Sequence, residues 1–424
     1  MVVAQVLMVF TLLFMVTGKT PIYLTAILGS TIAAIAAGFP LAGKADVTVL
    51  KLVNGGLNPV IADMAGVLMF IGIMEKAGFL DVIIHKIMQI GSKVGGAPGI
   101  TAAGSLVAGI IGALTGFTQP AVTAVITGPA AVKLGMDPNK TAGLAAHAGH
   151  FGNFAGFTHP TQVAVVATAA IGFGKINVVG AIVGLSIIWF SYFRLRREMA
   201  QEGKELSGEA LQKVQEELAS TYDIPFSKAI IPFIVFIAGF VVGYPVFIVG
   251  VITALLTALM GKVKLATGEA AMLEGVAKIA TPLVATIGFL YMSGVINKIG
   301  LVKTIADLLG PAVSVSPVLC MLLVSSVAGF LTQSNAASVA IDVPFLQVVL
   351  AMGADPLAAA CAAAGGSAVW QYFLTGGPVA ALSTVIPVIP GSELKAANKF
   401  QRPAMVFGFV VLFVCVVVVN MLAK

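Results

Sequence analysis

The chain has 424 residues, of which 58% are hydrophobic and only 10% are charged, and its mean hydropathy is +1.03. Soluble domains carry about 25% charged residues, so this composition excludes an ordinary water-soluble protein. The net charge of +6 comes from basic residues dispersed among the predicted loops. That distribution is typical of membrane proteins and argues against nucleic acid as a partner.

Apolar stretches close to or above the roughly 17 to 25 residues needed to cross a bilayer recur along the chain. The first begins at residue 2, has neither a basic preceding region nor a small-residue cleavage site, and leads directly into another span. We therefore expect a retained helix there and not a signal peptide. Others lie at 97–114, 178–193, 230–246 and 405–422. The pattern predicts an all-α, multi-pass protein of the cell inner membrane.

Two stretches of the first half are too rich in glycine, proline and polar side chains for an uninterrupted membrane helix. The first, 114–120, reads LTGFTQP, and the second, 147–160, reads HAGHFGNFAGFTHP. Non-helical backbone survives at membrane depth only where protein or a watery cavity satisfies its polar groups. Both stretches are therefore predicted to line a cavity.

A long polar stretch at 194–228 splits the chain near its middle. Its mixture of charges predicts a helical cytoplasmic linker at 194–226, between a first repeat at 1–193 and a second repeat at 227–424. Residues match across the linker at displacements of 218 to 224, which indicates a duplicated architecture. The matched anchors are Pro21 with Pro245, Pro59 with Pro282, the motif at 73–78 with that at 295–300, Pro138 with Pro356, and Pro160 with Pro378.

The distribution of basic residues predicts that the two repeats are inserted in opposite directions. The linker and a second cluster, Lys395, Lys399 and Arg402, should both face the cytoplasm. The uncharged start MVVAQ, and an end that lies one span beyond the second cluster, predict that both ends lie outside. Each repeat then crosses the membrane an odd number of times, so the two are antiparallel. Inverted repeats of this kind are typical of secondary transporters, whose substrate site lies near the bilayer midplane.

The second half repeats both polar breaks, at 331–338, LTQSNAAS, and at 365–378, GGSAVWQYFLTGGP. Helices that begin after such breaks aim free N–H groups at an anion, and nearby hydroxyl and amide oxygens can hold a sodium ion. The alternative is that these hydroxyls only bond to the backbone of packed helices. The predicted substrate-binding residues are Thr115, Thr118, Gln119, Asn153, Thr158, His159, Thr332, Gln333, Ser334, Asn335, Ser338, Gln371 and Thr375, and the candidate sodium ligands are Thr115, Ser334 and Asn335.

Ionisable residues inside apparent spans are costly and are therefore candidates for function. Asp63 and Asp342 are the clearest, and His147 and His150 join them as candidates for ion coupling. Loop-boundary positions for the aspartates and hydrogen-bonded packing for the histidines are the alternatives. No carboxylate lies among the histidines, so we expect no metal centre beyond a possible sodium site and no other cofactor.

The pattern resembles the ion transporter superfamily, and within it most nearly the gluconate permease and C4-dicarboxylate uptake families. The resemblance covers nearly the whole chain and rests on GKTPIYLTAIL, IMEKAGF, GHFGNFAGFTHPTQVAVVATAAIG, TGFTQP and TQSNAAS. It implies re-entrant hairpins with tips at 115–120 and 332–338, unwound helices at 147–160 and 365–378, and a homodimer with scaffold and transport parts.

These features together predict a symporter that imports a small organic acid anion by alternating access, driven by Na⁺ or H⁺. A cation/proton antiporter that uses Asp63, Asp342 and the histidines is an alternative, and so is a passive channel. An intramembrane enzyme is disfavoured because the sequence has no HExxH motif and no recognisable pair of nucleophile and base.

Overall fold

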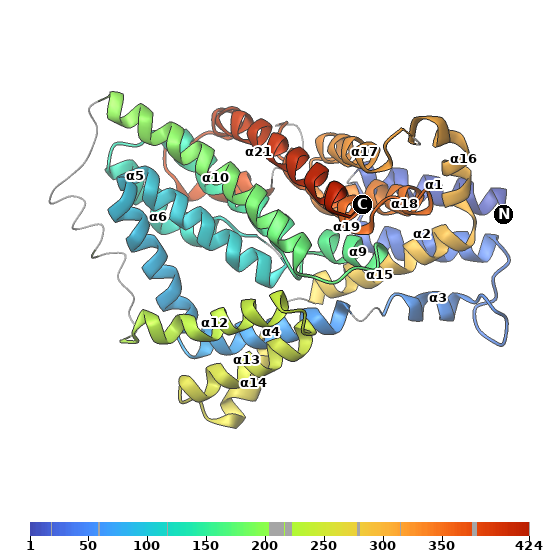
Figure 1. Cartoon of the computed structure of the whole chain (residues 1–424), viewed down its shortest axis with the longest axis horizontal. Coiled ribbons are helices and arrows are strands. Elements are labelled where there is room, and N and C mark those ends of the chain that lie inside the picture. Colours follow the sequence, from blue (N-terminus) through green and yellow to red (C-terminus); the bar gives the residue numbers. More distant parts are fainter. Residues whose placement is uncertain are drawn as a thin grey trace.

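The computed structural model is helical throughout the residues that it describes (Figure 1). These are residues 1–17, 19–57, 60–116, 118–202, 216, 223–277, 280–313, 315–374 and 380–423. The helices of the first half are α1 (Val2–Thr17), α2 (Ile22–Ala36), α3 (Val49–Gly55), α4 (Val60–Lys76), α5 (Phe79–Thr115), α6 (Ala121–Lys133), α7 (Pro138–Ala146), α8 (Ala148–Ala155), α9 (Pro160–Thr168) and α10 (Lys175–Gln201). The predicted all-α class is confirmed.

The second half follows the same order of long, short and broken helices. Its elements are α12 (Phe226–Val241), α13 (Val246–Met260), α14 (Leu265–Ala277), α15 (Ala280–Lys298), α16 (Leu301–Val313), α17 (Pro317–Thr332), α18 (Asn335–Ala351), α19 (Pro356–Trp370), α20 (Ala380–Val385), a 3₁₀ turn (Ile386–Val388) and α21 (Leu394–Leu422). The order resembles that of the first half, except that α16 and α17 stand where the single kinked α5 lies, and the single helix α19 stands where α7 and α8 lie.

Proline and aspartate start equivalent helices at equivalent places. Pro138 and Pro356 occupy the first turn of α7 and α19, where the missing N–H costs no hydrogen bond. Asp137 caps α7 by accepting a hydrogen bond from Lys140 N at 3.0 Å, and Asp355 caps α19 in the same way. Because the same local chemistry recurs, the two helices begin at matched points.

Three of the described helices, α5, α10 and α21, are long and apolar enough to cross a bilayer. Two bent pairs reach the same length, α3 with α4 at 42° and residues 283–298 of α15 with 301–308 of α16 at 68°. Large apolar side chains on α21, among them Val410, Phe413 and Val414, remain exposed. A soluble monomer rarely leaves such a face uncovered, so this surface faces lipid and the chain is a membrane protein.

One helix of each half packs against helices of the other half. The α4 helix packs against α13 and α14 of the second half, and α15 packs against α2 and α3 of the first half. Figure 1 shows α12, α13 and α14 beside α4 at the lower edge of the molecule. Glycines permit the close approach, because a Cβ on Gly66 would lie 2.6 Å from the Cα of Phe247. This reciprocal exchange fits a two-fold relation between the halves.

Two hairpins of short helices carry the predicted breaks. In one, α17 and α18 pack together and are joined only by Gln333 and Ser334. In the other, α5 bends at Gly95 and Gly96, which leave the helical conformation, and its second arm packs against α6. A helix of 16 residues such as α17 is about 24 Å long, shorter than the roughly 30 Å of a hydrocarbon core. The α17–α18 hairpin therefore has the dimensions of a re-entrant element.

The predicted linker at 194–226 is described only in part. The α10 helix continues through its start and ends at Gln201, with Arg194 Nε donating to Glu198 Oε1 at 3.1 Å. Residues 203–215 and 217–222 lie outside the described residues. The division of the chain at this linker stays a prediction.

Candidate functional site

A cavity of about 200 Å³ lies where the four predicted breaks of the chain meet. The prediction of an unwound helix at 365–378 was wrong for its first six residues, because α19 stays helical through Trp370. The turn before α6, the end of α8 with the start of α9, the turn between α17 and α18, and the end of α19 each contribute to its wall. The lining residues are Thr118, Asn153, His159, Gln333, Ser334, Asn335, Ala336, Gln371, Tyr372 and Ala381. Seven of the predicted substrate-binding residues are thus brought together from segments that are far apart in sequence.

Left-handed residues end the first helix of each hairpin. Gly116 follows α5 with φ of 84°, and Gln333 follows α17 with φ of 50°. A left-handed conformation cannot continue a right-handed helix, and glycine adopts it at far lower cost than glutamine. Ser334 then caps α18 by accepting a hydrogen bond from Ala337 N at 3.3 Å. The helices therefore break at both predicted turns.

The starts of α9 and α18 lie at the cavity wall. His159 precedes the first residue of α9, and Ser334 precedes the first residue of α18. Helix starts carry unpaired N–H groups and the positive end of the helix dipole, so they favour an anion. The described lining contains no lysine or arginine. Any anion held here would be held by neutral donors.

Asn335 connects three of the elements around the cavity. Its backbone N–H donates to Gln371 Oε1 at 3.3 Å, and its Nδ2 lies 3.4 Å from His159 Nδ1. Its Oδ1 accepts from Ser367 Oγ at 3.0 Å, and its carbonyl accepts from Thr161 Oγ1 at 2.7 Å. A substitution of Asn335 would therefore disturb contacts with α9, α18 and α19 at the same time.

Residues that the repeat makes equivalent touch each other beside the cavity. Asn153 Nδ2 donates to Gln371 Oε1 at 3.2 Å, and His150 Nδ1 lies 3.1 Å from the carbonyl of Ala368. Both pairs are 218 residues apart, the displacement found between the repeats in this part of the chain. Such contacts are expected when the axis that relates the halves passes between the partners.

Several predicted residues bond to backbone instead. Thr115 Oγ1 donates to Ile111 O, Thr332 Oγ1 to Ala328 O and Ser338 Oγ to Asn335 O, each at 2.8 Å. Thr115 does not line the cavity that holds Ser334 and Asn335, so the three predicted sodium ligands are not brought together there. The backbone alternative describes these hydroxyls better.

Two further predicted residues, Gln119 and Thr158, do not line the cavity. Gln119 is exposed beside the first turn. Thr158 is fully buried, and its hydroxyl has no hydrogen-bond partner among the described residues. Thr375 lies outside the described residues.

Asp63 lies away from the cavity. Its Oδ1 accepts a hydrogen bond from Phe247 N at 2.9 Å, in the first turn of α13. A carboxylate at a helix start satisfies one of the unpaired N–H groups there. Asp63 thus has a structural partner at the contact between the halves.

The histidine pair is buried behind the cavity. His147 Nε2 lies 2.8 Å from Ser191 Oγ, and the rings of His147 and His150 are 5.5 Å apart. The His150 ring is 5.1 Å from the ring of Tyr372, which lines the cavity. Among the described residues, no group of three histidine, cysteine or acidic side chains is placed to hold a metal ion.

Tyr372 lines the cavity but was not among the predicted substrate-binding residues. The Tyr372 hydroxyl accepts from Asn153 Nδ2 at 3.2 Å, so it belongs to the polar wall. The available signal was its position next to Gln371 in the second broken segment.

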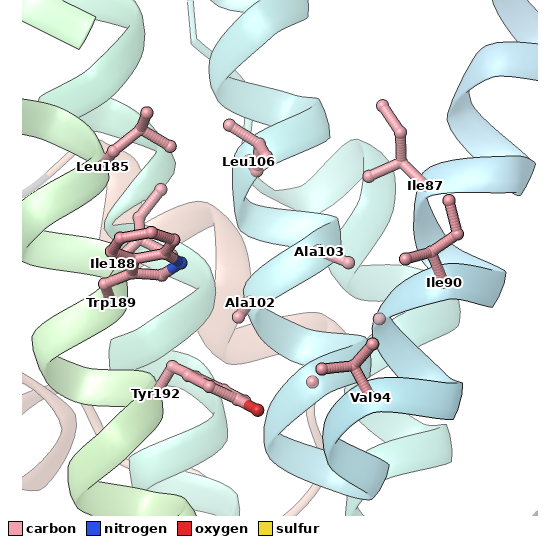
Figure 2. Close-up of a pocket in the computed structure, with 12 residues that line it drawn as sticks. Ile87, Ile90, Val94, Ala102, Ala103, Leu106, Leu185, Ile188, Trp189 and Tyr192 are labelled. Carbon is pink, nitrogen blue, oxygen red and sulfur yellow. The ribbon is translucent and has the colours of Figure 1, made fainter. Parts of the chain in front are cut away.

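A second pocket of about 240 Å³ lies between the arms of α5 and α10 (Figure 2). Its wall is apolar apart from the polar atoms of Tyr192 and Trp189, and none of the predicted residues lines it.

No protein-family model and no curated protein sequence matches this chain. Several solved structures do. The Alcanivorax borkumensis YdaH transporter, described as having an unusual topology, matches with a TM-score of 0.57 and 16% identity over 99% of this chain and 98% of its own. Neisseria gonorrhoeae MtrF, described as illuminating a class of antimetabolite efflux pumps, matches with a TM-score of 0.61 and 16% identity over 94% and 95% of the two chains. The chain therefore shares its fold, over almost its whole length, with a transporter and an efflux pump.

Proposed function

We propose that the chain is a multi-pass secondary transporter of the cell inner membrane that carries a small organic acid anion. The cavity at the four breaks is the observation that carries this proposal. Its volume of about 200 Å³ lies below the roughly 300 to 1,000 Å³ of pockets for drug-sized ligands, which favours a small solute. Its helix starts and neutral donors favour a negative charge.

Alternating access follows from the way the cavity is built. Residues from both halves meet across it, and the α17–α18 hairpin reaches it with a turn of only two residues. A rigid movement of the hairpins against the rest of the molecule would open the same residues to either side. We propose that Na⁺ or H⁺ drives the movement in the direction of uptake, as the gluconate and C4-dicarboxylate resemblance implies, and that the protein works as a homodimer.

MtrF is described as an efflux pump, so the direction of transport needs its own test. Symport, which gives uptake in the cell, predicts that the anion accumulates inside proteoliposomes when the Na⁺ or H⁺ gradient is directed inward. An exporter that exchanges the anion for Na⁺ or H⁺ would instead accumulate it only when the ion gradient is directed outward, and that result would establish efflux.

A thermal-shift screen of the purified protein tests the choice of substrate. Carboxylates, sugar acids and sulfonates are added with and without sodium, and we expect at least one organic anion to raise the melting temperature. The best ligand is then used for uptake into proteoliposomes. Gln371→Ala should weaken uptake because the Gln371 amide bridges Asn153 and Asn335 at the cavity. The matched control is Gln201→Ala, which removes an exposed amide at the end of α10.

A cation/proton antiporter is the alternative, favoured by the buried Asp342 and by the buried pair of His147 and His150. It predicts cation flux that needs no organic anion. If protons or sodium alone stabilise the protein and no organic anion does, the antiporter replaces the anion carrier.

A further inference from the structure

Asp342 is a fully buried carboxylate on α18, seven residues after the start of that helix at Asn335. Neither of its oxygens has a hydrogen-bond partner among the described residues. An unpaired charge inside a membrane protein is costly, and it persists where a cation or a proton neutralises it. Asp342 does not line the organic-anion cavity, so it forms a separate feature.

Three buried serines surround the Asp342 carboxyl group, Ser325 from α17, Ser338 from α18 and Ser367 from α19. Close contact of α17 with α19 brings two of them together. A Cβ on Gly329 would lie 2.6 Å from the Cα of Ser367. Because Gly329 has no side chain, the two helix backbones approach closely enough for serines on both to reach one carboxylate.

Each of the three hydroxyls gives its proton to a different acceptor. Ser325 Oγ donates to the carbonyl of Ala363, Ser338 Oγ donates to the carbonyl of Asn335 at 2.8 Å, and Ser367 Oγ donates to Asn335 Oδ1 at 3.0 Å. With their protons given to these acceptors, the hydroxyls offer oxygen lone pairs to the space beside the carboxylate. A set of neutral oxygens around one carboxylate suits a hard cation.

We propose that Asp342 binds a sodium ion together with the hydroxyl oxygens of Ser325, Ser338 and Ser367. A protonated carboxyl group would need only one acceptor for its single proton, whereas three converging oxygens provide several ligands for a metal cation. The carboxylate neutralises the charge of the ion, so the pair can lie inside the membrane. This site differs from the predicted sodium site at Thr115, Ser334 and Asn335.

Asn335 connects the sodium site to the organic-anion cavity. Two of the proposed ligands, Ser338 and Ser367, donate to Asn335, which itself lines the cavity. Sodium that orders these serines also orders Asn335, so each ligand should strengthen the binding of the other. The coupling rests on the proposed function, while the sodium site itself does not.

The test measures sodium binding by thermal shift and by isothermal titration calorimetry at constant pH, with choline keeping the ionic strength constant. Sodium should stabilise the wild-type protein in a saturable way, and choline should not. Asp342→Asn should abolish this stabilisation. Asp307→Asn, which removes an exposed carboxylate of α16, is the matched control and should keep it.

Ser367→Ala gives an independent reading if Asp342→Asn does not fold, because it leaves the carboxylate in place. Loss of one neutral oxygen should weaken sodium binding by roughly 10- to 100-fold, as for other groups that support a bound metal. In the wild type, saturating sodium should raise the affinity for the organic anion by roughly tenfold, within the usual range of coupling between sites. Asp342→Asn should remove this increase.

Several outcomes would overturn the sodium site. One is the absence of any sodium effect, and another is an unchanged sodium affinity in both Asp342→Asn and Ser367→Ala. A third is a stabilisation that depends on pH but not on sodium and that disappears in Asp342→Asn, which would identify a proton site. If sodium stabilises the protein while every organic anion fails, the anion carrier is wrong and the sodium site stands. If an anion binds and both variants keep the wild-type response to sodium, only the sodium site is wrong.

Discussion

The two hairpins occupy equivalent places in the two halves, yet they contribute unequally to the cavity. The α17–α18 hairpin supplies Gln333, Ser334, Asn335 and Ala336 to the wall, whereas the α5–α6 turn supplies Thr118. The two hairpins therefore have similar backbones, but the second hairpin supplies most of the residues that line the cavity. A single solute lying on the axis between two unlike copies would be bound in one orientation.

The same inequality holds for buried charge. Asp342 lies in α18, whereas α6, the second helix of the first hairpin, has no acidic residue and its Ala124 is fully buried. The serine Ser367 is matched by Gly149. The first half therefore lacks both the carboxylate and one of the hydroxyls that the second half uses. The comparison predicts that only the second hairpin tolerates a charge, and substitutions can test that.

The largest effect is expected for Ala124→Asp, which places a carboxylate in the second helix of the first hairpin. Ala124 is buried in an apolar cluster, so the new charge would cost several kcal/mol, on the order of the protein's whole stability. We expect little or no folded protein in size-exclusion chromatography in detergent. Ala200→Asp, at an exposed position of α10, is the control and should fold. Normal folding of Ala124→Asp would mean that the hairpins are less different than their sequences indicate.

Asn335→Ala should cause the next largest effect. It removes the Asn335 side-chain contacts with His159 and Ser367, and each lost buried contact costs about 1–3 kcal/mol. Uptake of the organic anion into proteoliposomes should fall by roughly tenfold or more. Asn54→Ala, at an exposed position of α3, should transport normally. Wild-type uptake by Asn335→Ala would remove the second hairpin from the site.

Gly329→Ala tests the close contact between α17 and α19. The added Cβ would lie 2.6 Å from the backbone of Ser367, and such overpacking costs about 1–3 kcal/mol. The melting temperature in detergent should fall. Gly55→Ala adds a methyl group in open space, with nothing within 4 Å, and should leave the melting temperature nearly unchanged. Equal melting temperatures for both variants would contradict the packing described for the sodium site.

Thr118→Val should have the smallest effect on uptake and tests the contribution of the first hairpin to the cavity. It keeps the shape of the side chain and removes the hydroxyl that lies 3.4 Å from Asn153 Oδ1. The loss of one hydrogen bond of about 0.5–1.5 kcal/mol should lower uptake only a few-fold. An effect larger than that of Asn335→Ala would reverse the proposed ranking of the two hairpins.

The helical class and the position of the breaks could be predicted from the sequence because both depend on local chemistry. Apolar runs predict membrane helices, and the clusters of Gly, Pro and amides at 114–120 and 331–338 predict their interruption. The actual breaks are shorter than predicted at the second turn, where only Gln333 and Ser334 separate the helices. Local chemistry gives the existence of a break better than its length.

The direction in which a hydroxyl points could not be predicted. Thr115 and Thr118 lie in the same turn, yet the first bonds to the preceding helix and the second lines the cavity. Long-range contacts were equally inaccessible, because the partner of Asp63 is Phe247, 184 residues away. Ser325 and Ser367 looked like ordinary small residues in apolar helices until packing placed them beside Asp342.

The exchange of α4 and α15 between the halves has a consequence for biogenesis. The main partners of α4 are α13 and α14, which end at residue 277, although α4 also contacts α5 of its own half. During synthesis the first half leaves the ribosome before α13 and α14 are made. The first half therefore cannot complete its tertiary structure until the second half has entered the bilayer. Neither half expressed alone should therefore behave as a folded unit, whereas the two expressed together should complement each other.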